Sequence, residues 1–135
     1  MKQKIEYIEI SKLHLWSENP RDPINKDANE FEIISHALQD DREKWNLDKL
    51  LNKMGTHYDF SELPTVVQEK DDYIVYDGNR RLAIIKILQN QSLYQSIMGR
   101  MFLPDNIEHF LSLDKIPCNV CDKETALDNI ERKLF

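Results

Sequence analysis

The sequence has little glycine, proline or cysteine for its length. Three glycines and five prolines in 135 residues exclude a flexible linker or a low-complexity tract. Two cysteines without an apolar N-terminal leader do not form a disulfide framework, and we expect a cytoplasmic protein. No apolar run approaches the roughly 18 residues of a membrane span, so no membrane partner is expected. These absences indicate one ordinary domain, large enough to bury a single hydrophobic core.

Acidic residues are missing from one stretch of an otherwise acidic chain. The net charge is −6, from 18 basic and 24 acidic residues. Residues 78–104 contain four basic residues and no acid, so the rest of the chain sums to −10 (−6 minus +4). A domain that coats DNA is usually basic over a broad surface, whereas this island indicates a local anion site. Chance clustering is the alternative that composition leaves open.

Hydrophobic periodicity predicts a fold in which strands and helices alternate irregularly, an α+β fold. The expected strands are residues 4–10, 65–68, 73–76 and 116–120, the middle two forming a hairpin. The expected helices begin near residues 27 and 42, span 79–89, occupy 92–113 with breaks at Gly99 and Pro104, and follow the capping residue Asp122. Gly55 is expected to end the second helix. Because the last helix is still amphipathic at Phe135, we expect residues 1–135 to be one domain excised from a longer protein.

The segment Asp77-Gly78-Asn79-Arg80-Arg81 joins the second hairpin strand to the helix at 79–89. A helix N-terminus offers unpaired N–H groups at the positive end of its dipole. Gly78 lacks the Cβ that would keep an anion from the backbone, and two arginines can add bidentate contacts to phosphate oxygens. Asp77 and Asn79 suit local hydrogen bonds that hold the turn. The segment predicts a phosphate-binding turn; a glycine turn with merely solvated arginines is the alternative.

This turn resembles the Gly-x-Arg-Arg-type turn of the ParB/sulfiredoxin superfamily, which follows a strand hairpin in the N-terminal domain of those proteins. Asn19-Pro20-Arg21 resembles a shortened form of the family's early Asn-Pro-x-x-Arg box. Ile116-Pro117-Cys118-Asn119-Val120 resembles its Ile-Pro-x-x-Val strand, and Asp128-Asn129-Ile130-Glu131-Arg132 its Glu-Asn-x-x-Arg box with Asp for Glu. The likeness spans residues 4–135. It implies an α+β fold with a small mixed β-sheet, containing a hairpin and packed by several helices.

The resemblance also implies a pocket for a nucleoside triphosphate, CTP or ATP, with Mg²⁺. The nucleotide-binding residues that it implies are Asn19, Arg21, Asp77, Gly78, Asn79, Arg80, Arg81 and Arg132, and the magnesium ligands are Asp128 and Asn129. Oxygen ligands of this kind are those that magnesium prefers. For Arg132, an ordinary i,i+4 ion pair on a solvated helix face is an equal alternative.

The implied function is a nucleotide-binding module, a switch or NTPase, that serves a DNA-related process through another domain or partner, with a homodimer left open. Asn79 stands where the sulfiredoxin branch has its catalytic cysteine, which speaks against sulfinic-acid reduction. Two alternatives stay open. One is an enzyme of the same superfamily, either a nuclease or a phosphotransferase resembling the free-serine kinases, whose turn shares Asp77-Gly78. The other is a non-catalytic partner-binding domain.

Several further residues have competing interpretations. Cys118-x-x-Cys121 lacks the additional ligands of a zinc site, so two small buried hydrophobes are expected. Trp16 could stack on a base or pin the neighbouring loop to the core. The acids that could serve as a general base are Glu18, Asp22, Glu30 and Asp77, and the sequence does not rank them.

Overall fold

The computed structural model describes residues 2–39, 44–55, 58–60, 62–98 and 107–134. Within these residues the fold is α+β, as predicted, with a five-stranded mixed sheet and six α-helices. The chain divides into two compact units, each made of non-contiguous segments. The sheet unit comprises residues 1–16, 60–79 and 114–135, and the helical unit comprises residues 17–59 and 80–113.

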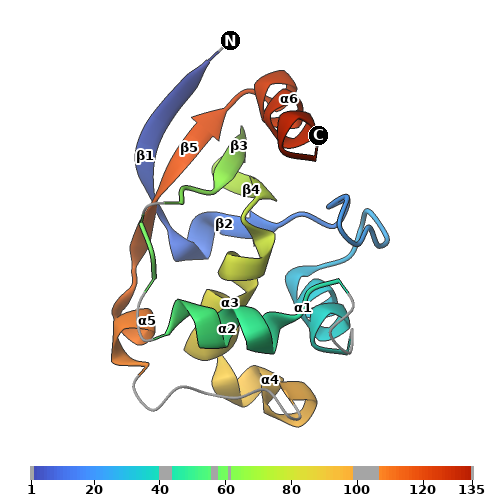
Figure 1. Cartoon of the computed structure of the whole chain (residues 1–135), viewed down its shortest axis with the longest axis vertical. Helices are drawn as coiled ribbons and strands as arrows, with labels where there is room; N and C mark the ends of the chain where they lie inside the picture. Colours follow the sequence, from blue (N-terminus) through green and yellow to red (C-terminus); the bar gives the residue numbers. More distant parts are fainter. Residues whose placement is uncertain (1, 40–43, 56–57, 61, 99–106, 135) are drawn as a thin grey trace. The chain divides into compact units, whose positions relative to one another are not determined.

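The sheet unit holds all five strands and the last helix. The strands are β1 (Gln3–Glu9), β2 (Leu13–Leu15), β3 (Thr65–Glu69), β4 (Asp72–Asp77) and β5 (Lys115–Cys121), with a short 3₁₀ turn, Ile10–Lys12, before β2. Their order across the sheet is β1-β5-β3-β4-β2. β1 pairs with β5, and β3 with β4, in antiparallel fashion, whereas β3–β5 and β2–β4 are parallel. β1 is therefore one edge of the sheet (Figure 1).

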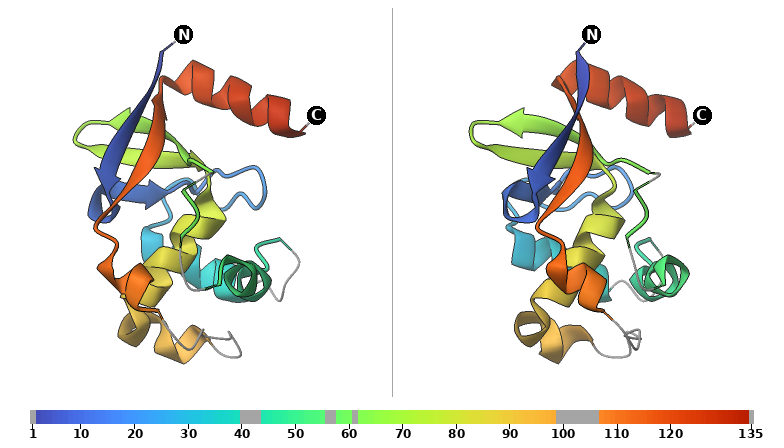
Figure 2. Two further views of the ribbon diagram at one scale, coloured as in Figure 1. Left: turned by 60° about the vertical axis from the view of Figure 1, so that its left-hand side comes forward. Right: turned by 90° about the vertical axis from the view of Figure 1, so that its left-hand side faces the viewer.

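The hairpin and the last helix follow the sequence pattern closely. β3 and β4 are joined by Lys70 and Asp71, a tighter turn than the four-residue connection that the pattern suggests, with Lys70 at φ +59°. α6 (Lys123–Leu134) lies along one face of the sheet, against β3, β4 and β5 (Figure 2). The carboxylate of Asp122 accepts the N–H of Thr125 at 2.7 Å, which confirms the predicted cap.

Both cysteines of β5 are buried and unpaired with each other, as expected for small hydrophobic residues. Burial raises the pKa of the Cys118 thiol to about 12. Cys121 packs in a core cluster with Tyr76 of β4 and Ala126 of α6. Cys121 therefore contributes to the packing between α6 and the sheet.

The helical unit is organised around α3. Its helices are α1 (Glu30–Gln39), α2 (Leu47–Met54), α3 (Asn79–Gln89, whose first residue belongs to the sheet unit), α4 (Gln91–Met98) and α5 (Glu108–Ser112). Six apolar residues on all sides of α3 are at most 2% exposed: Leu82, Ala83, Ile84, Ile85, Ile87 and Leu88. Figures 1 and 2 show the other helices of the unit arranged around it. A helix that is apolar all round is a buried one, as the sequence predicted.

Helix boundaries differ from the pattern by a few residues, for local reasons. α1 begins after a capping box in which the Glu32 N–H donates to Asn29 Oδ1 and the Asn29 N–H to Glu32 Oε1. α2 begins at Leu47, directly after Asn46 in the left-handed region, and ends at Gly55 with φ +70°, as predicted. The expected breaks at Gly99 and Pro104 lie outside the described residues. No helix in the described part of the chain is long and apolar enough to cross a membrane.

Candidate functional site

The turn after β4 requires glycine for reasons of backbone and packing. Asp77 is the last residue of β4, Asn79 is the first of α3, and Gly78 between them has φ +103°. A Cβ at Gly78 would lie 2.9 Å from Cβ of Pro64 and 3.3 Å from its Cα. The sequence predicted that the absence of a Cβ at Gly78 lets an anion approach the backbone. In the structure the space that a Cβ would need is occupied by Pro64, within the sheet unit.

Asn79 holds this turn with both ends of its side chain. Its Oδ1 accepts the N–H of Trp16 at 2.9 Å, and its Nδ2 donates to the carbonyl of Val75 at 2.8 Å. The residue is 4% exposed, so these bonds replace water for the side chain. The indole of Trp16 stacks on Tyr76, with ring centroids 4.1 Å apart. Asn79 therefore holds the turn by local hydrogen bonds, as expected, and Trp16 packs on the sheet through Tyr76.

Three arginines gather in the helical unit, and we call Arg21, Arg80 and Arg81 the arginine cluster. Arg80 and Arg81 lie in the first turn of α3, and Arg21 lies in the loop before α1. Nε of Arg80 donates to the carbonyl of Trp45 at 2.6 Å, and Nη1 of Arg21 donates to the carbonyl of Lys44 at 3.0 Å. Adjacent carbonyls of one loop thus hold two guanidinium groups side by side.

The arginine cluster is electrostatically strained. The pKa of Arg80 is lowered, first by burial and then by the positive charges of Arg21 and Arg81. Like charges held together raise the free energy of the ionised state, and an anion placed among them lowers it. Asn19 is buried, and its Oδ1 accepts the N–H of Arg21 at 3.2 Å, which fixes the backbone that carries this guanidinium. The arrangement can accept a multiply charged anion.

Asp22 anchors the same loop, which the sequence did not foresee. This carboxylate is 5% exposed and contacts Nε1 of Trp45 at 2.9 Å, Nζ of Lys44 at 3.2 Å and Nε2 of His36 at 2.7 Å. Burial raises the pKa of Asp22, but the hydrogen bonds from Trp45 and Lys44 and the interaction with His36 outweigh it, and the net pKa is lowered. A carboxylate of low pKa is a weak base, so Asp22 positions the loop that carries Arg21 rather than acting as a general base. No spacing in the sequence links these four residues.

The last box lies on α6, in the sheet unit. Nη2 of Arg132 pairs with Oδ2 of Asp128 at 2.9 Å, the i,i+4 ion pair that the sequence left open. Asn129 donates from Nδ2 to Oε1 of Gln3 on β1 at 3.1 Å. Lys133, the residue after Arg132 on α6, donates a short hydrogen bond to the carboxylate of Asp77 at the end of β4.

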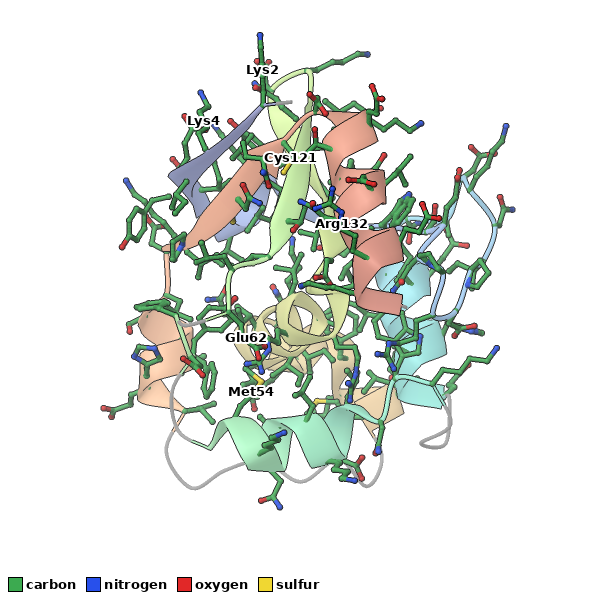
Figure 3. The ribbon with its side chains drawn as sticks, turned by 45° about the horizontal axis from the view of Figure 1, so that its top comes forward. Lys2, Lys4, Met54, Glu62, Cys121 and Arg132 are labelled. Atoms are coloured by element: carbon green, nitrogen blue, oxygen red, sulfur yellow. The ribbon has the colours of Figure 1, made fainter. Side chains whose placement is uncertain are left out.

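Asn129 and Arg132 line a pocket of about 600 Å³ on the sheet unit. Its polar lining is formed by three cations, three amides and one hydroxyl residue: Lys4, Arg132, Lys133, Gln3, Asn119, Asn129 and Thr65. The amides are connected, because Oε1 of Gln3 accepts from both asparagines, at 3.0 and 3.1 Å. Figure 3 shows Arg132 on α6 and Lys4 on β1. The sequence nominated Asn129 and Arg132 but not Gln3 or Asn119, which reach the pocket only through the pairing of β1 with β5.

The residues that the resemblance assigns to magnesium offer a small donor set. The carboxylate of Asp128 is engaged by Arg132, and Asn129 uses its amide nitrogen on Gln3, which leaves its carbonyl oxygen. Among the described residues, no three or more His, Cys, Asp or Glu side chains gather at one point. One carboxylate and one amide fit a magnesium ion that brings a substrate's phosphates and several waters with it.

The predicted site residues are divided between the two units. The helical unit contains Asn19, Arg21, Arg80 and Arg81; the sheet unit contains Asp77, Gly78, Asn79, Asp128, Asn129 and Arg132. Within the helical unit the arginines come together. Within the sheet unit, Asn129 and Arg132 share a pocket, while Asp77, Gly78 and Asn79 form the turn.

Comparison with known proteins gives no relative from which a function could be transferred. The chain matches no protein-family model, and neither the curated proteins nor the solved structures contain a match.

Proposed function

We propose that this chain is a nucleotide-binding module, in which the arginine cluster binds the phosphate groups. The observation that supports the proposal is that carbonyls of one loop hold the guanidinium groups of Arg80 and Arg21 together, with Arg81 next to Arg80 on α3. Burial first, and then the charges of Arg21 and Arg81, lower the pKa of Arg80. Holding these charges together costs free energy in the unbound protein, and a polyanion compensates it. The proposal extends to Mg²⁺ with CTP or ATP as the ligand, and to a role in a DNA-related process.

Phosphate suits the cluster better than a single carboxylate does. A guanidinium group has five N–H donors in a planar fork that matches two oxygens of a phosphate. Arg80 donates two hydrogen bonds, and Arg21 one, to backbone carbonyls of residues 44–46. These bonds orient the two guanidinium groups and use only some of the five N–H donors of each. Several such groups together match an anion with many oxygens, as in a di- or triphosphate.

The test is a titration of the full chain with CTP, ATP, ADP and GTP, with and without Mg²⁺, followed by thermal unfolding and calorimetry. One nucleotide should stabilise the protein by about 2.7 kcal/mol at one hundred times its dissociation constant. Arg81→Ala and Arg80→Lys should each weaken binding by roughly 10- to 100-fold, since a charge-assisted hydrogen bond contributes about 1.5–3 kcal/mol. The lysine variant keeps the charge at Arg80 and removes the fork.

A matched control separates the cluster from net charge. Lys53→Ala removes an exposed cation near the end of α2, in the same unit, and should leave the dissociation constant unchanged. Stabilisation by no nucleotide, or equal weakening by Lys53→Ala and Arg81→Ala, would refute the proposal. Following phosphate release in the same samples distinguishes a switch that only binds from a nucleotide hydrolase.

The residues on α6 give a second, independent arm of this test. If magnesium with its nucleotide contacts the last box, Asp128→Asn should reduce the magnesium dependence of binding. Arg132→Ala should then weaken binding even without the metal. If both variants bind like the wild type, the assignment of Asp128 to magnesium and of Arg132 to the nucleotide is wrong.

A further inference from the structure

The outer edge of β1 has the features of a strand that pairs with another chain. β1 is seven residues long and stands at the end of the strand order. Ile5 and Tyr7, on one face of this strand, are each 66% exposed, the highest values among the large hydrophobic residues described. A long edge strand with exposed apolar side chains is a template for strand addition unless something covers it.

The hydrogen-bond pattern shows which residues of β1 point their backbone outward. The register of β1 with β5 continues from Glu9–Lys115 to Ile10–Asp114, and the Ile10 N–H donates to the Asp114 carbonyl directly opposite, at 2.8 Å. In an antiparallel pair, hydrogen-bonded and non-bonded positions alternate. The residues of β1 whose N–H and C=O point away from β5 are therefore Gln3, Ile5, Tyr7 and Glu9.

β5 supports this assignment independently. Asn119 lies opposite Ile5, and its N–H donates to the carbonyl of Pro64 at 2.8 Å rather than to β1. Pro117 lies opposite Tyr7 and has no N–H to donate. Ile5–Asn119 and Tyr7–Pro117 are thus non-hydrogen-bonded pairs of the antiparallel ladder. The backbone N–H and C=O groups of Ile5 and Tyr7 therefore point away from β5.

We propose that two copies of this chain associate through their β1 strands, antiparallel, with Ile5 opposite Ile5 of the partner subunit. In this register both outward N–H and C=O groups of Ile5 bond across the two-fold axis. Gln3 then stands opposite Tyr7 of the partner subunit, with the same bonds. The two sheets become one continuous sheet, and the interface is isologous, as in most homodimers.

Charge complementarity selects this register. It places Lys4 opposite Glu6 of the partner subunit, and Glu6 opposite Lys4 of the partner subunit, so two cross-strand ion pairs form on the other face. In the single chain these two side chains pair with each other at 3.1 Å, and they are 68% and 38% exposed. Centring the pairing on Glu6 would place like charges directly opposite each other, which destabilises a sheet.

The interface between the two β1 strands would be small and would adjoin the pocket on the sheet unit. Two seven-residue strands bury a small area, at the low end for specific interfaces, so the dimer should dissociate at micromolar concentration. The face that carries Ile5 also carries Gln3, which lines the pocket on the sheet unit. Tyr7 of the partner subunit would thus lie next to Gln3 at this pocket.

A charge-swap experiment tests the register. Analytical ultracentrifugation of the wild type between roughly 1 and 500 µM should show a monomer–dimer equilibrium, as expected for a weak complex. Lys4→Glu and Glu6→Lys alone should each weaken dimerisation at least tenfold, because each places like charges opposite each other. An equimolar mixture of the two variants should form heterodimers, and the double swap Lys4→Glu/Glu6→Lys should restore the homodimer.

Cross-linking adds a position-specific control. Residues opposite each other in a hydrogen-bonded pair have Cα atoms about 5.5 Å apart, within the range of a disulfide. Ile5→Cys should therefore form a disulfide-linked dimer under mild oxidation, whereas Tyr7→Cys should not, since its counterpart lies four residues away along the strand. Both positions are exposed, and circular dichroism will show that the variants fold.

Three results would overturn the proposal. A wild-type chain that is monomeric over the whole concentration range excludes the dimer. Dimerisation that the single charge reversals leave unchanged, or equal cross-linking of Ile5→Cys and Tyr7→Cys, shows a different interface. None of these outcomes depends on nucleotide binding, so this inference and the proposed function can fail separately.

Discussion

Replacing Gly78 with alanine should destabilise the protein by more than a change of backbone preference alone. A non-glycine residue at positive φ costs about 1–2 kcal/mol. The added Cβ would lie 2.9 Å from Cβ of Pro64, a contact that must be relieved by moving backbone, and overpacking of this kind costs about 1–3 kcal/mol. The lower entropy of the unfolded alanine chain returns about 0.4–1 kcal/mol. The expected net loss for Gly78→Ala is therefore roughly 1–4.5 kcal/mol.

Gly55→Ala is the matched control. Gly55 also has positive φ, at +70°, but a Cβ there would meet no atom within 4 Å. Its φ and ψ, +70° and −128°, lie outside the left-handed helical region. The expected cost of Gly55→Ala is the strain of a sparsely populated conformation less the gain in the unfolded chain, about 0–2.5 kcal/mol, without the packing cost that adds to the loss at Gly78. Urea unfolding of both variants should show midpoints that differ while the slope m stays constant. Equal losses for the two substitutions would refute the role assigned to Pro64.

Three other predictions concern groups that the structure buries. Asn79→Ala removes two backbone hydrogen bonds, one of them from Trp16, and should cost about 1–3 kcal/mol in urea unfolding; a loss below about 0.5 kcal/mol would contradict the role of this side chain at the turn. Because the folded pKa of Asp22 is lowered, its carboxylate contributes stability above the unfolded pKa near 4, which is lost as pH falls through the folded pKa. Asp22→Asn should flatten stability between about pH 5 and 2, and an unchanged acid limb would contradict this. With a pKa of about 12, Cys118 should react with a thiol reagent at neutral pH only as the protein unfolds, and rapid labelling in a Cys121→Ser background would contradict its burial.

The hairpin and the central helix could be predicted because their patterns are local. Val66 and Val75 lie in short β-branched and aromatic runs on either side of a polar turn, and both are fully buried at the centre of the sheet. Six of the seven residues from Leu82 to Leu88 are apolar, Lys86 being the exception, and they cover more than one face of a helix. β2 was not predicted, because three residues carry no periodicity and the strand exists only through its pairing with β4.

The candidate site was predictable only in part. Arg80 and Arg81 follow a strand and open a helix, so their place at a helix start followed from local sequence. That Arg21 reaches them depends on Asp22 and its three partners, which are 14 to 23 residues further along the chain. Chain closure over such distances is decided by packing and hydrogen bonding, which leave no fixed spacing in a sequence.

The turn at Gly78 shows the same division. The sequence alone determined that a glycine, an amide and two arginines follow a strand, because these residue types have local preferences of their own. Only the tertiary structure decided what each one does: Pro64 occupies the space beside Gly78, and Trp16 and Val75 engage the side chain of Asn79. It also brings Arg21 to Arg80. Local preferences act between neighbours in the chain, whereas these contacts form only once distant segments pack together.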